Sequence, residues 1–378
     1  MEALVGKSRP RCGFRRFGIF LPVLTVILGA CASAPVMDSG TIEALQARNE
    51  NLETRLRTLE ARRGQVPVAV VKARAAVVFI WGTYTFADNA GRMLRHVLDE
   101  NGEPVADAKG VPMVDLTGTG SVAVQNYMGT AFLVDREGRL LTNRHIAEPW
   151  WEDEGDAPLL AAGLRPVFIR LRAFFPGHLE AVPIEVLRVD PTLDVALVRT
   201  VGWTPTADPL PIHPESDRLE EGQAVILIGF PTGLDAVLSK LSVQEYSAMD
   251  RAGGANQYAT AEYLSRENRL SPTITGGFVW EIRPHVLVYD ARTTGGGSGG
   301  PVLDRQGRVI GVNAAYLEEF EGGNYGVPIQ AGQRLLAGGG QPATAANREQ
   351  PTLISEKKPS VEVAPITGHD NAVRNFRR

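Results

Sequence analysis

The apolar residues of this chain occur mostly in short runs that are separated by turn residues. Two turns, "DREG" and "DRQG", each lie between strand-like runs, at 130–135 and 139–142 and at 301–304 and 308–314. Short apolar runs on either side of a glycine-containing turn are typical of β-hairpins. With 40 glycines and 25 prolines, the sequence favours a turn-rich, all-β fold over most of its length.

The first 30 residues have the pattern of an export signal. "RPRCGFRR" is basic, and the "FGIFLPVLTVILGA" that follows is apolar but short for a membrane span. The pattern predicts a signal peptide at 1–30, and "LGAC" looks like a bacterial lipobox, which implies lipidation of Cys31. An ordinary secretory peptide and an uncleaved anchor are the alternatives. We therefore expect a protein of the bacterial cell envelope that is anchored to a membrane by lipid and faces the periplasm or the exterior.

Residues 31–66 form the predicted linker and stalk. Within 41–62 the successive a and d positions of a heptad repeat are occupied by Ile42, Leu45, Asn49, Leu52, Leu56 and Leu59. This spacing predicts a parallel coiled coil, and with it a homo-oligomer. Because only three heptads are present, a single solvated helix is the alternative.

Composition and the remaining segments limit the function classes. The chain has 378 residues, and its net charge of −4 gives no sign of a nucleic-acid partner. If Cys12 leaves with the signal and Cys31 carries lipid, the mature domain has no disulfide. Residues 84–128 and 250–280 are expected to be long loops, and the polar, aperiodic stretch 337–378 is expected to be a disordered tail.

Ser298 lies in an unusual setting, "TTGGGSGGPVLD", which leads directly into the predicted hairpin at 301–314. The alternative without a catalytic role is a flexible glycine-rich turn. However, a linker would not run straight into a strand, and glycines on both sides allow a substrate backbone to approach closely. They also allow two N–H groups to point at a developing oxyanion, which a serine nucleophile requires.

A serine nucleophile needs a histidine base and a carboxylate that orients the base. Of six histidines, His145 follows the predicted strand 139–142, and surface or packing roles suit the others better, with His178 as a weak second candidate. Asp194, in "VDPTLDVALVRT", opens an apolar strand, whereas Asp190 has the setting of a turn residue. Together His145, Asp194 and Ser298 predict a catalytic triad.

The segments "GTAFLVDREGRLLTNRHI", "DPTLDVALVRT", "EGQAVILIGFPTGL", "GGGSGGPVLDRQGRVIGVN" and "NYGVPI" resemble, in order, the motifs of trypsin-like serine proteases of the HtrA/Deg branch. The resemblance implies a double barrel of two six-stranded antiparallel β-barrels at 67–336, and it implies no cofactor and no metal. It makes His145 the general base, Asp194 the orienting acid and Ser298 the nucleophile. The oxyanion hole would be formed by the backbone N–H groups of Gly296 and Ser298.

By the same resemblance, the strand around Asn313, Ala314 and Ala315 would wall the specificity pocket and pair with the substrate backbone. The chain departs from the family at Gly297, where these proteases usually carry asparagine or, in the trypsin branch, aspartate. Three successive glycines are expected to make the oxyanion loop costly to order. Many HtrA relatives carry a PDZ domain after the protease domain, and residues 337–378 leave no room for one.

These observations predict a serine endopeptidase that acts on exported or envelope proteins, with a role in protein quality control. Two alternatives remain. A catalytically silent protease fold would bind exposed peptide segments, and an envelope scaffold would depend on its stalk and tail alone.

Overall fold

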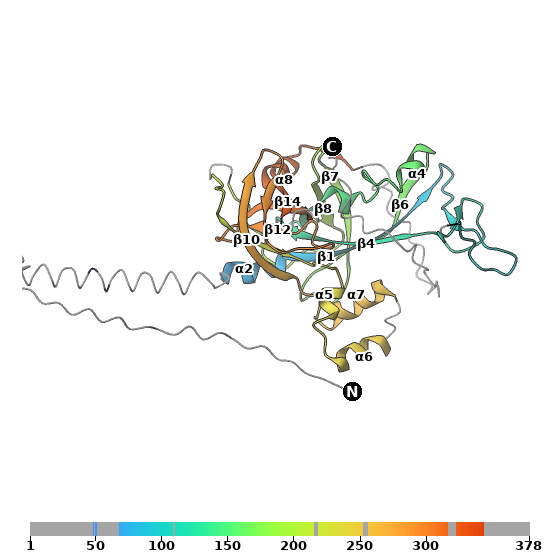
Figure 1. The fold of residues 1–378 in the computed structure, drawn as a ribbon, viewed down its shortest axis with the longest axis horizontal. Helices are drawn as coiled ribbons and strands as arrows, with labels where there is room; N and C mark the ends of the chain where they lie inside the picture. The colour runs from blue at the N-terminus through green and yellow to red at the C-terminus, as the bar shows by residue number, and fades with distance from the viewer. Residues whose placement is uncertain are drawn as a thin grey trace, which may run out of the picture. The chain divides into compact units, whose positions relative to one another are not determined.

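The computed structural model describes Arg48, Glu50 and residues 68–108, 110–214, 218–251, 256–316 and 323–343 (Figure 1). The chain divides into two units, 1–65 and 66–378, and the description below concerns the second. The predicted signal peptide, Cys31 and nearly all of the predicted coiled coil lie outside the described residues. In the described part of the chain, no helix is long and apolar enough to cross a membrane.

Six antiparallel strands close into the first barrel. In spatial order they run β7-β6-β1-β4-β5-β8, and the pairing of β8 with β7 completes the ring. Their bounds are β1 Val77–Ala87, β4 Gln125–Leu133, β5 Arg139–Thr142, β6 Arg165–Phe174, β7 Val182–Val189 and β8 Ala196–Thr200.

A second ring of six antiparallel strands, β10-β11-β14-β13-β12-β9, is also closed. Its strands are β9 Ala224–Gly229, β10 Thr273–Ile282, β11 Leu287–Tyr289, β12 Pro301–Leu303, β13 Val309–Tyr316 and β14 Asn324–Pro328. The predicted fold of two six-stranded antiparallel barrels is therefore confirmed.

One continuous core joins the barrels. It contains Ile80 from β1, Leu141 from β5, Val312 from β13 and Leu335 from the helix α8 (Ile329–Leu336), all nearly inaccessible to solvent. The whole length of β1 is buried, because its two faces are covered by different parts of the domain. The hydrophobic effect thus fixes the two barrels against each other, and loops from both are held at their junction.

The predicted turns form through one local mechanism. In "DREG", an oxygen of the Asp135 carboxylate accepts hydrogen bonds from the backbone N–H groups two and four residues later, at 2.8 and 3.1 Å. Asp304 in "DRQG" does the same at 2.8 and 2.9 Å, and so does Asp99 in the loop turn "DENG". Aspartate followed by glycine three residues later therefore fixes these turns without help from distant residues.

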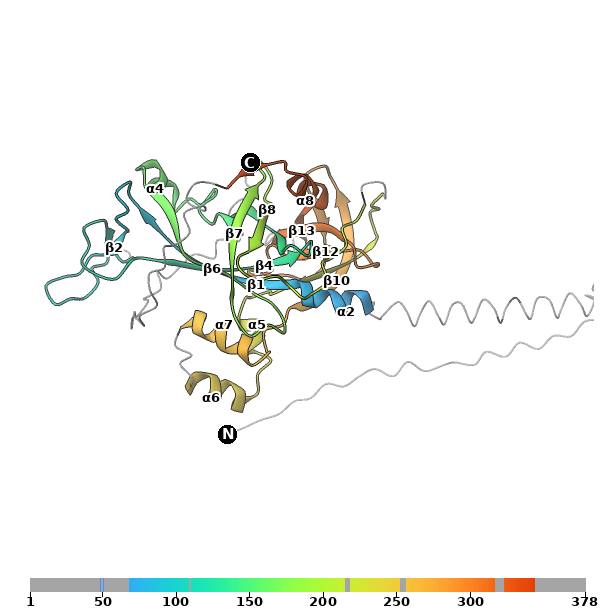
Figure 2. The same ribbon diagram turned by 180° about the vertical axis from the view of Figure 1, so that it is seen from behind.

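The two segments expected to be long loops differ. Residues 88–124 form a small extension with one two-stranded sheet, β2 (Arg95–His96) and β3 (Val114–Asp115), at the far end of β1, β4 and β6 (Figures 1 and 2). The stretch 250–280 is not only loop. It contains the helix α7 (Gln257–Arg266) and most of β10, and α7 is capped by the Asn256 side chain, which accepts from the Tyr258 N–H at 2.8 Å.

Together with α5 (Asp235–Leu238) and α6 (Val243–Arg251), α7 forms a helical insertion between β9 and β10. Figures 1 and 2 both show these helices grouped on one side of the barrels. Leu264 of α7 is fully buried in a cluster with Phe79 and Trp81 of β1 and with Phe230. The insertion is therefore packed onto the barrels and is part of the domain.

The domain begins close to its predicted start and extends slightly beyond its predicted C-terminal boundary. A short helix α2 (Val68–Ala73) and a 3₁₀ turn (Arg74–Ala76) lead into β1. After α8, β15 (Gln341–Pro342) pairs with β7, so the stretch expected to be disordered from 337 is ordered up to at least residue 343. The rest of the predicted tail lies outside the described residues.

Candidate active site

His145 and Asp194 are brought together by the pairing of β5 with β8. In this antiparallel pair Thr142 lies opposite Ala196, so the chain leaving β5 and the chain entering β8 are at the same end of the barrel. His145 follows β5 in the four-residue helix α3 (Arg144–Ala147), and Asp194 lies two residues before the start of β8. The predicted histidine and aspartate are thus neighbours because of strand register.

The contact between the two side chains is close and doubly anchored. His145 Nδ1 lies 2.7 Å from Asp194 Oδ2, and the backbone N–H of His145 donates to Asp194 Oδ1 at 3.0 Å. Asn143 Nδ2 donates to the Asp194 carbonyl at 2.7 Å, which holds the loop in place. A carboxylate at Nδ1 favours the tautomer with hydrogen on Nδ1, so Nε2 is left as the acceptor that a general base needs.

Ser298 lies in the loop between β11 and β12 and is only 6% exposed. Its carbonyl accepts from the Thr130 N–H at 2.8 Å, so β4 of the first barrel holds this loop of the second. The Ser298 hydroxyl donates to the carbonyl of Ala314 at 3.0 Å. Within the described residues, no hydrogen bond joins this hydroxyl to His145.

The glycines around Ser298 are required by space as well as by backbone angle. Gly299 has φ +85°, and a Cβ there would fall 1.9 Å from the Thr130 carbonyl oxygen. Gly296 also has φ +85°, and the N–H of Gly297 donates to the Thr294 carbonyl at 3.1 Å. Neither the Gly296 nor the Ser298 N–H has a protein acceptor within the described residues, so both are available to an oxyanion.

The predicted oxyanion loop, residues 294–298, is held by hydrogen bonds to several of its carbonyls. Thr130 Oγ1 donates to Gly296 O at 2.8 Å, and Asn313 Nδ2 donates to Gly297 O at 2.9 Å. A Cβ at Gly297 would fall 2.2 Å from Thr293 Oγ1, so the asparagine that the family usually has here would force Thr293 to move.

The strand β13 contains a bulge beside Ser298. Asn313 pairs with Gly326 and Ala315 with Tyr325, so Ala314 is an extra residue whose carbonyl turns out of the ladder. That carbonyl is the acceptor of the Ser298 hydroxyl. The Asn313 side chain is buried and holds the oxyanion loop, while its Oδ1 accepts from the Tyr289 hydroxyl. Of the three residues predicted to contact substrate, Asn313 therefore links β13 to the loop that carries Ser298.

The other candidate residues are accounted for by packing or turns. The ring of His178 stacks on Trp203 with centroids 4.5 Å apart, and His96 and His213 are buried. Asp190 caps its own turn by accepting from the Thr192 and Leu193 N–H groups, as predicted. Of the remaining histidines, His369 lies outside the described residues.

The segment "EPWWEDEGD" after His145 packs against the first barrel. Trp150 is buried between Tyr84 and Phe168, and Asp156 accepts from the Tyr84 hydroxyl at 2.6 Å and from Gln125 at 2.8 Å. Burial raises the pKa of the Asp156 carboxyl. This segment supports the wall of the barrel, and its aspartate is held by neutral donors rather than by a cation.

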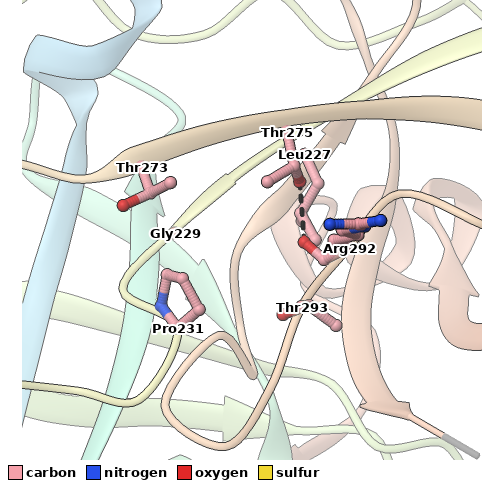
Figure 3. Close-up of a pocket in the computed structure, with 7 residues that line it drawn as sticks. All are labelled: Leu227, Gly229, Pro231, Thr273, Thr275, Arg292 and Thr293. Carbon is pink, nitrogen blue, oxygen red and sulfur yellow. Dashed lines mark hydrogen bonds between the residues drawn. The ribbon is translucent and has the colours of Figure 1, made fainter. Parts of the chain in front are cut away.

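Arg292, six residues before Ser298, is exposed beside a shallow depression that is also lined by Pro231, Thr275 and Thr293 (Figure 3). The Thr275 hydroxyl donates to the backbone carbonyl of Arg292 at 2.8 Å. Arg292 therefore lies at the surface beside the antiparallel pair of strands β9 and β10.

Residues 129–312, which contain His145, Asp194 and Ser298, match the family described as "Trypsin-like peptidase domain". The second unit of the chain contains a trypsin-like peptidase domain. The peptidase domain is 29% identical over 209 residues to the putative serine protease HhoB of Synechocystis sp., a match that covers 55% of this chain and 39% of HhoB. It is 25% identical to a probable periplasmic serine endoprotease DegP-like of Marinomonas sp., with 55% of this chain and 34% of that protein covered.

The resemblance to the HtrA/Deg branch is therefore confirmed. This chain spans about two-fifths or less of the length of these relatives. Among solved structures, the serine endoprotease from Yersinia pestis is 18% identical, with a TM-score of 0.41 and coverage of 72% of this chain and 67% of that one.

Thr130 and Thr232 are functional candidates that sequence reasoning missed. Thr130 donates to the oxyanion loop through both its hydroxyl and its N–H, and its hydroxyl accepts from the Phe230 N–H at 3.2 Å. Thr232 N–H donates to Gly295 O. Both residues lie inside motifs that carried the resemblance, "GTAFLV" and "GFPTGL", and that position was the only available signal.

Proposed function

We propose that the peptidase domain is a serine endopeptidase in which His145, Asp194 and Ser298 act as a catalytic triad. The observation that carries the proposal is the His145 Nδ1–Asp194 Oδ2 contact of 2.7 Å, together with a serine loop in which two N–H groups have no acceptor among the described residues. Ser298 attacks the peptide carbonyl while His145 Nε2 takes its proton, and Asp194 stabilises the resulting imidazolium.

The oxyanion of the tetrahedral intermediate is bound by the N–H groups of Gly296 and Ser298. His145 then gives the proton to the leaving amine, and water hydrolyses the acyl-enzyme by the same steps. A substrate N–H that binds the Ala314 carbonyl displaces the Ser298 hydroxyl from it, which frees the hydroxyl to turn toward His145. The bulged strand at 313–315 thus links substrate pairing to nucleophile orientation.

Labelling with a fluorophosphonate tests this proposal most directly. An activated Ser298 forms a phosphonyl ester, and tryptic mass spectrometry should find the adduct on the peptide that contains "GGGSGG". His145→Ala should abolish the labelling, and His178→Ala should leave it unchanged. An adduct at another serine, or none in the folded wild type, would favour a catalytically silent peptide-binding fold or a scaffold.

We further propose that the enzyme acts on exported or envelope proteins in quality control, from a lipid anchor at Cys31 and as a homo-oligomer through residues 41–62. The export pattern, the lipobox-like "LGAC" and the heptads support this proposal, as does the periplasmic location named for the Marinomonas relative.

Cys31→Ser should release the protein from the membrane fraction, because one residue carries the whole anchor. The measurement is fractionation of bacteria that express the full chain, before and after a salt wash, with Cys12→Ser as the matched control. If the Cys31→Ser protein stays in the washed membranes, the anchor is an uncleaved hydrophobic segment instead.

A further inference from the structure

Arg144 lies directly before His145 and binds the loop that ends at Asp194. It is the first residue of the helix α3, and its side chain is only 13% exposed. Its Nη1 donates to the carbonyl of Asp190 at 3.0 Å and to that of Pro191 at 3.2 Å. The side chain therefore connects the helix that carries the histidine with the beginning of the loop that carries the aspartate.

The loop 190–195 is closed by its own hydrogen bonds. The Asp190 N–H donates to the Val195 carbonyl at 3.0 Å. The Asp190 carboxylate accepts from two N–H groups inside the loop, both at 3.0 Å. Because its ends are joined and its interior is capped by one side chain, we expect the loop to move as one body. A displacement at residues 190 and 191 is then passed on to Asp194.

Two side chains attach this loop to the corner between β5 and α3. Asn143 Nδ2 donates to the Asp194 carbonyl at one end of the loop, and Arg144 binds the two carbonyls at the other end. A loop held by one hydrogen bond can pivot about it, whereas bonds at both ends also fix its orientation. The orientation matters because the Asp194 carboxylate has to meet both Nδ1 and the backbone N–H of His145.

The guanidinium of Arg144 is held in place by residues of the segment that follows His145. Its Nε donates to Glu148 Oε2 at 3.1 Å, and Glu148 is 1% exposed. Its Cζ lies 4.6 Å from the centroid of the Trp151 ring. A planar guanidinium can bind a carboxylate, carbonyl oxygens and an aromatic face at the same time, a set of contacts that the ammonium group of lysine does not reproduce.

This supporting segment is itself fixed to the first barrel. Trp150 is 7% exposed and packs between aromatic rings of β1 and β6. The Trp151 N–H donates to the Glu148 carbonyl at 2.8 Å, so the two residues that hold the guanidinium are joined by a turn. The segment "EPWWEDEGD" therefore does more than cover the barrel, because it also supports Arg144 from behind.

We infer that Arg144 is a positioning residue: supported by Glu148 and Trp151, it holds the loop 190–194 so that Asp194 stays in contact with His145 Nδ1. This inference rests on the proposed protease function. Glu148 and Trp151 keep the guanidinium in place, and the bonds to the two carbonyls act on the loop. Without these bonds Asp194 leaves Nδ1 more often. The imidazole then loses both its orientation and the carboxylate that stabilises its charged form.

The test separates the charge of Arg144 from its hydrogen bonds to the loop. Arg144→Ala alone would take the cation away from a buried carboxylate, which destabilises the fold for reasons unrelated to Asp194. The double variant Arg144→Met/Glu148→Gln removes both charges, and methionine fills the space beside Trp151. It should lower kcat per titrated active site by about tenfold. KM for an unfolded model substrate should change little, because the strand that pairs with substrate is untouched.

Glu148→Gln alone should have a much smaller effect on kcat, of about twofold, because the bonds from Arg144 to the two carbonyls remain. The matched control is Arg308→Met/Asp304→Asn, which removes an ion pair of the same spacing, with Arg308 Nε 2.7 Å from Asp304 Oδ2 and the aspartate side chain 7% exposed. It should lower stability and leave kcat unchanged. Wild-type kcat in Arg144→Met/Glu148→Gln would overturn the inference.

Proton NMR gives a readout that does not need activity. A proton in a short, charge-assisted hydrogen bond between Nδ1 and a carboxylate resonates far downfield of the amide protons. This signal should disappear in Arg144→Met/Glu148→Gln and persist in Arg308→Met/Asp304→Asn. If Ser298 is not labelled by the fluorophosphonate but the signal behaves in this way, the proposed function fails and the positioning by Arg144 stands. If Ser298 is labelled and Arg144→Met/Glu148→Gln keeps the signal, Arg144 does not act through Asp194 and only the inference fails.

Discussion

Ser298→Ala and His145→Ala should each lower peptide-bond hydrolysis by about 10⁴-fold or more, and the double variant should be little worse than either single one. The nucleophile and its base act as one unit. Once either side chain is lost, removal of the other therefore lowers the rate little further. The measurement is the initial rate on an unfolded fluorogenic protein, with the concentration of folded enzyme determined independently.

Ser265→Ala is a matched control for the loss of a buried hydroxyl. Ser265 is 3% exposed and its hydroxyl donates to the His178 carbonyl at 3.0 Å, as the Ser298 hydroxyl does to Ala314. Its removal should lower stability by about 1 kcal/mol and leave kcat nearly unchanged. If Ser298→Ala and Ser265→Ala have similar effects on the rate, Ser298 is not the nucleophile.

The parts of the fold that could be predicted from the sequence are those fixed locally or by strand order. In the turns at Asp135 and Asp304, the carboxylate accepts hydrogen bonds from the N–H groups two and four residues later. A local sequence of four or five residues therefore specifies each turn. His145 and Asp194 each adjoin an apolar strand, and antiparallel pairing of those strands is enough to bring them together.

The helical insertion was missed for a physical reason. The helix α7 has the sequence "QYATAEYLSR", in which Ala261, Leu264 and Ser265 are the residues that it buries together with Thr260. Small and polar residues on the buried face leave no clear amphipathic period to read. The helix is stabilised by packing on β1, which the sequence of α7 alone does not reveal.

The state of the oxyanion loop was also beyond sequence reasoning. Three glycines indicate conformational freedom, but the residues that restrict the loop come from distant parts of the chain. Thr130 precedes Gly296 by 166 residues, and Asn313 and Thr232 belong to other strands and loops. The local sequence determines how much conformational entropy is lost when such a loop is ordered. Hydrogen bonds to distant residues determine whether the ordered loop is nevertheless stable.

Asp194→Asn should lower kcat by about 10⁴-fold while leaving the protein folded. The amide keeps the shape of the side chain, and its oxygen can still accept from the His145 N–H. However, an NH₂ group facing Nδ1 donates, so the imidazole carries its hydrogen on Nε2, and the base can no longer take the Ser298 proton.

Asp190→Asn provides the comparison, because it makes the same change in the same loop. Asp190 caps its turn and lies within 3.4 Å of Arg334, with no contact to His145 in the described structure. It should lower thermal stability and leave kcat per titrated site within about twofold. If the two asparagine variants lose activity equally, Asp194 only supports the loop. A large loss confined to Asp194→Asn means that the carboxylate acts on the tautomer of His145.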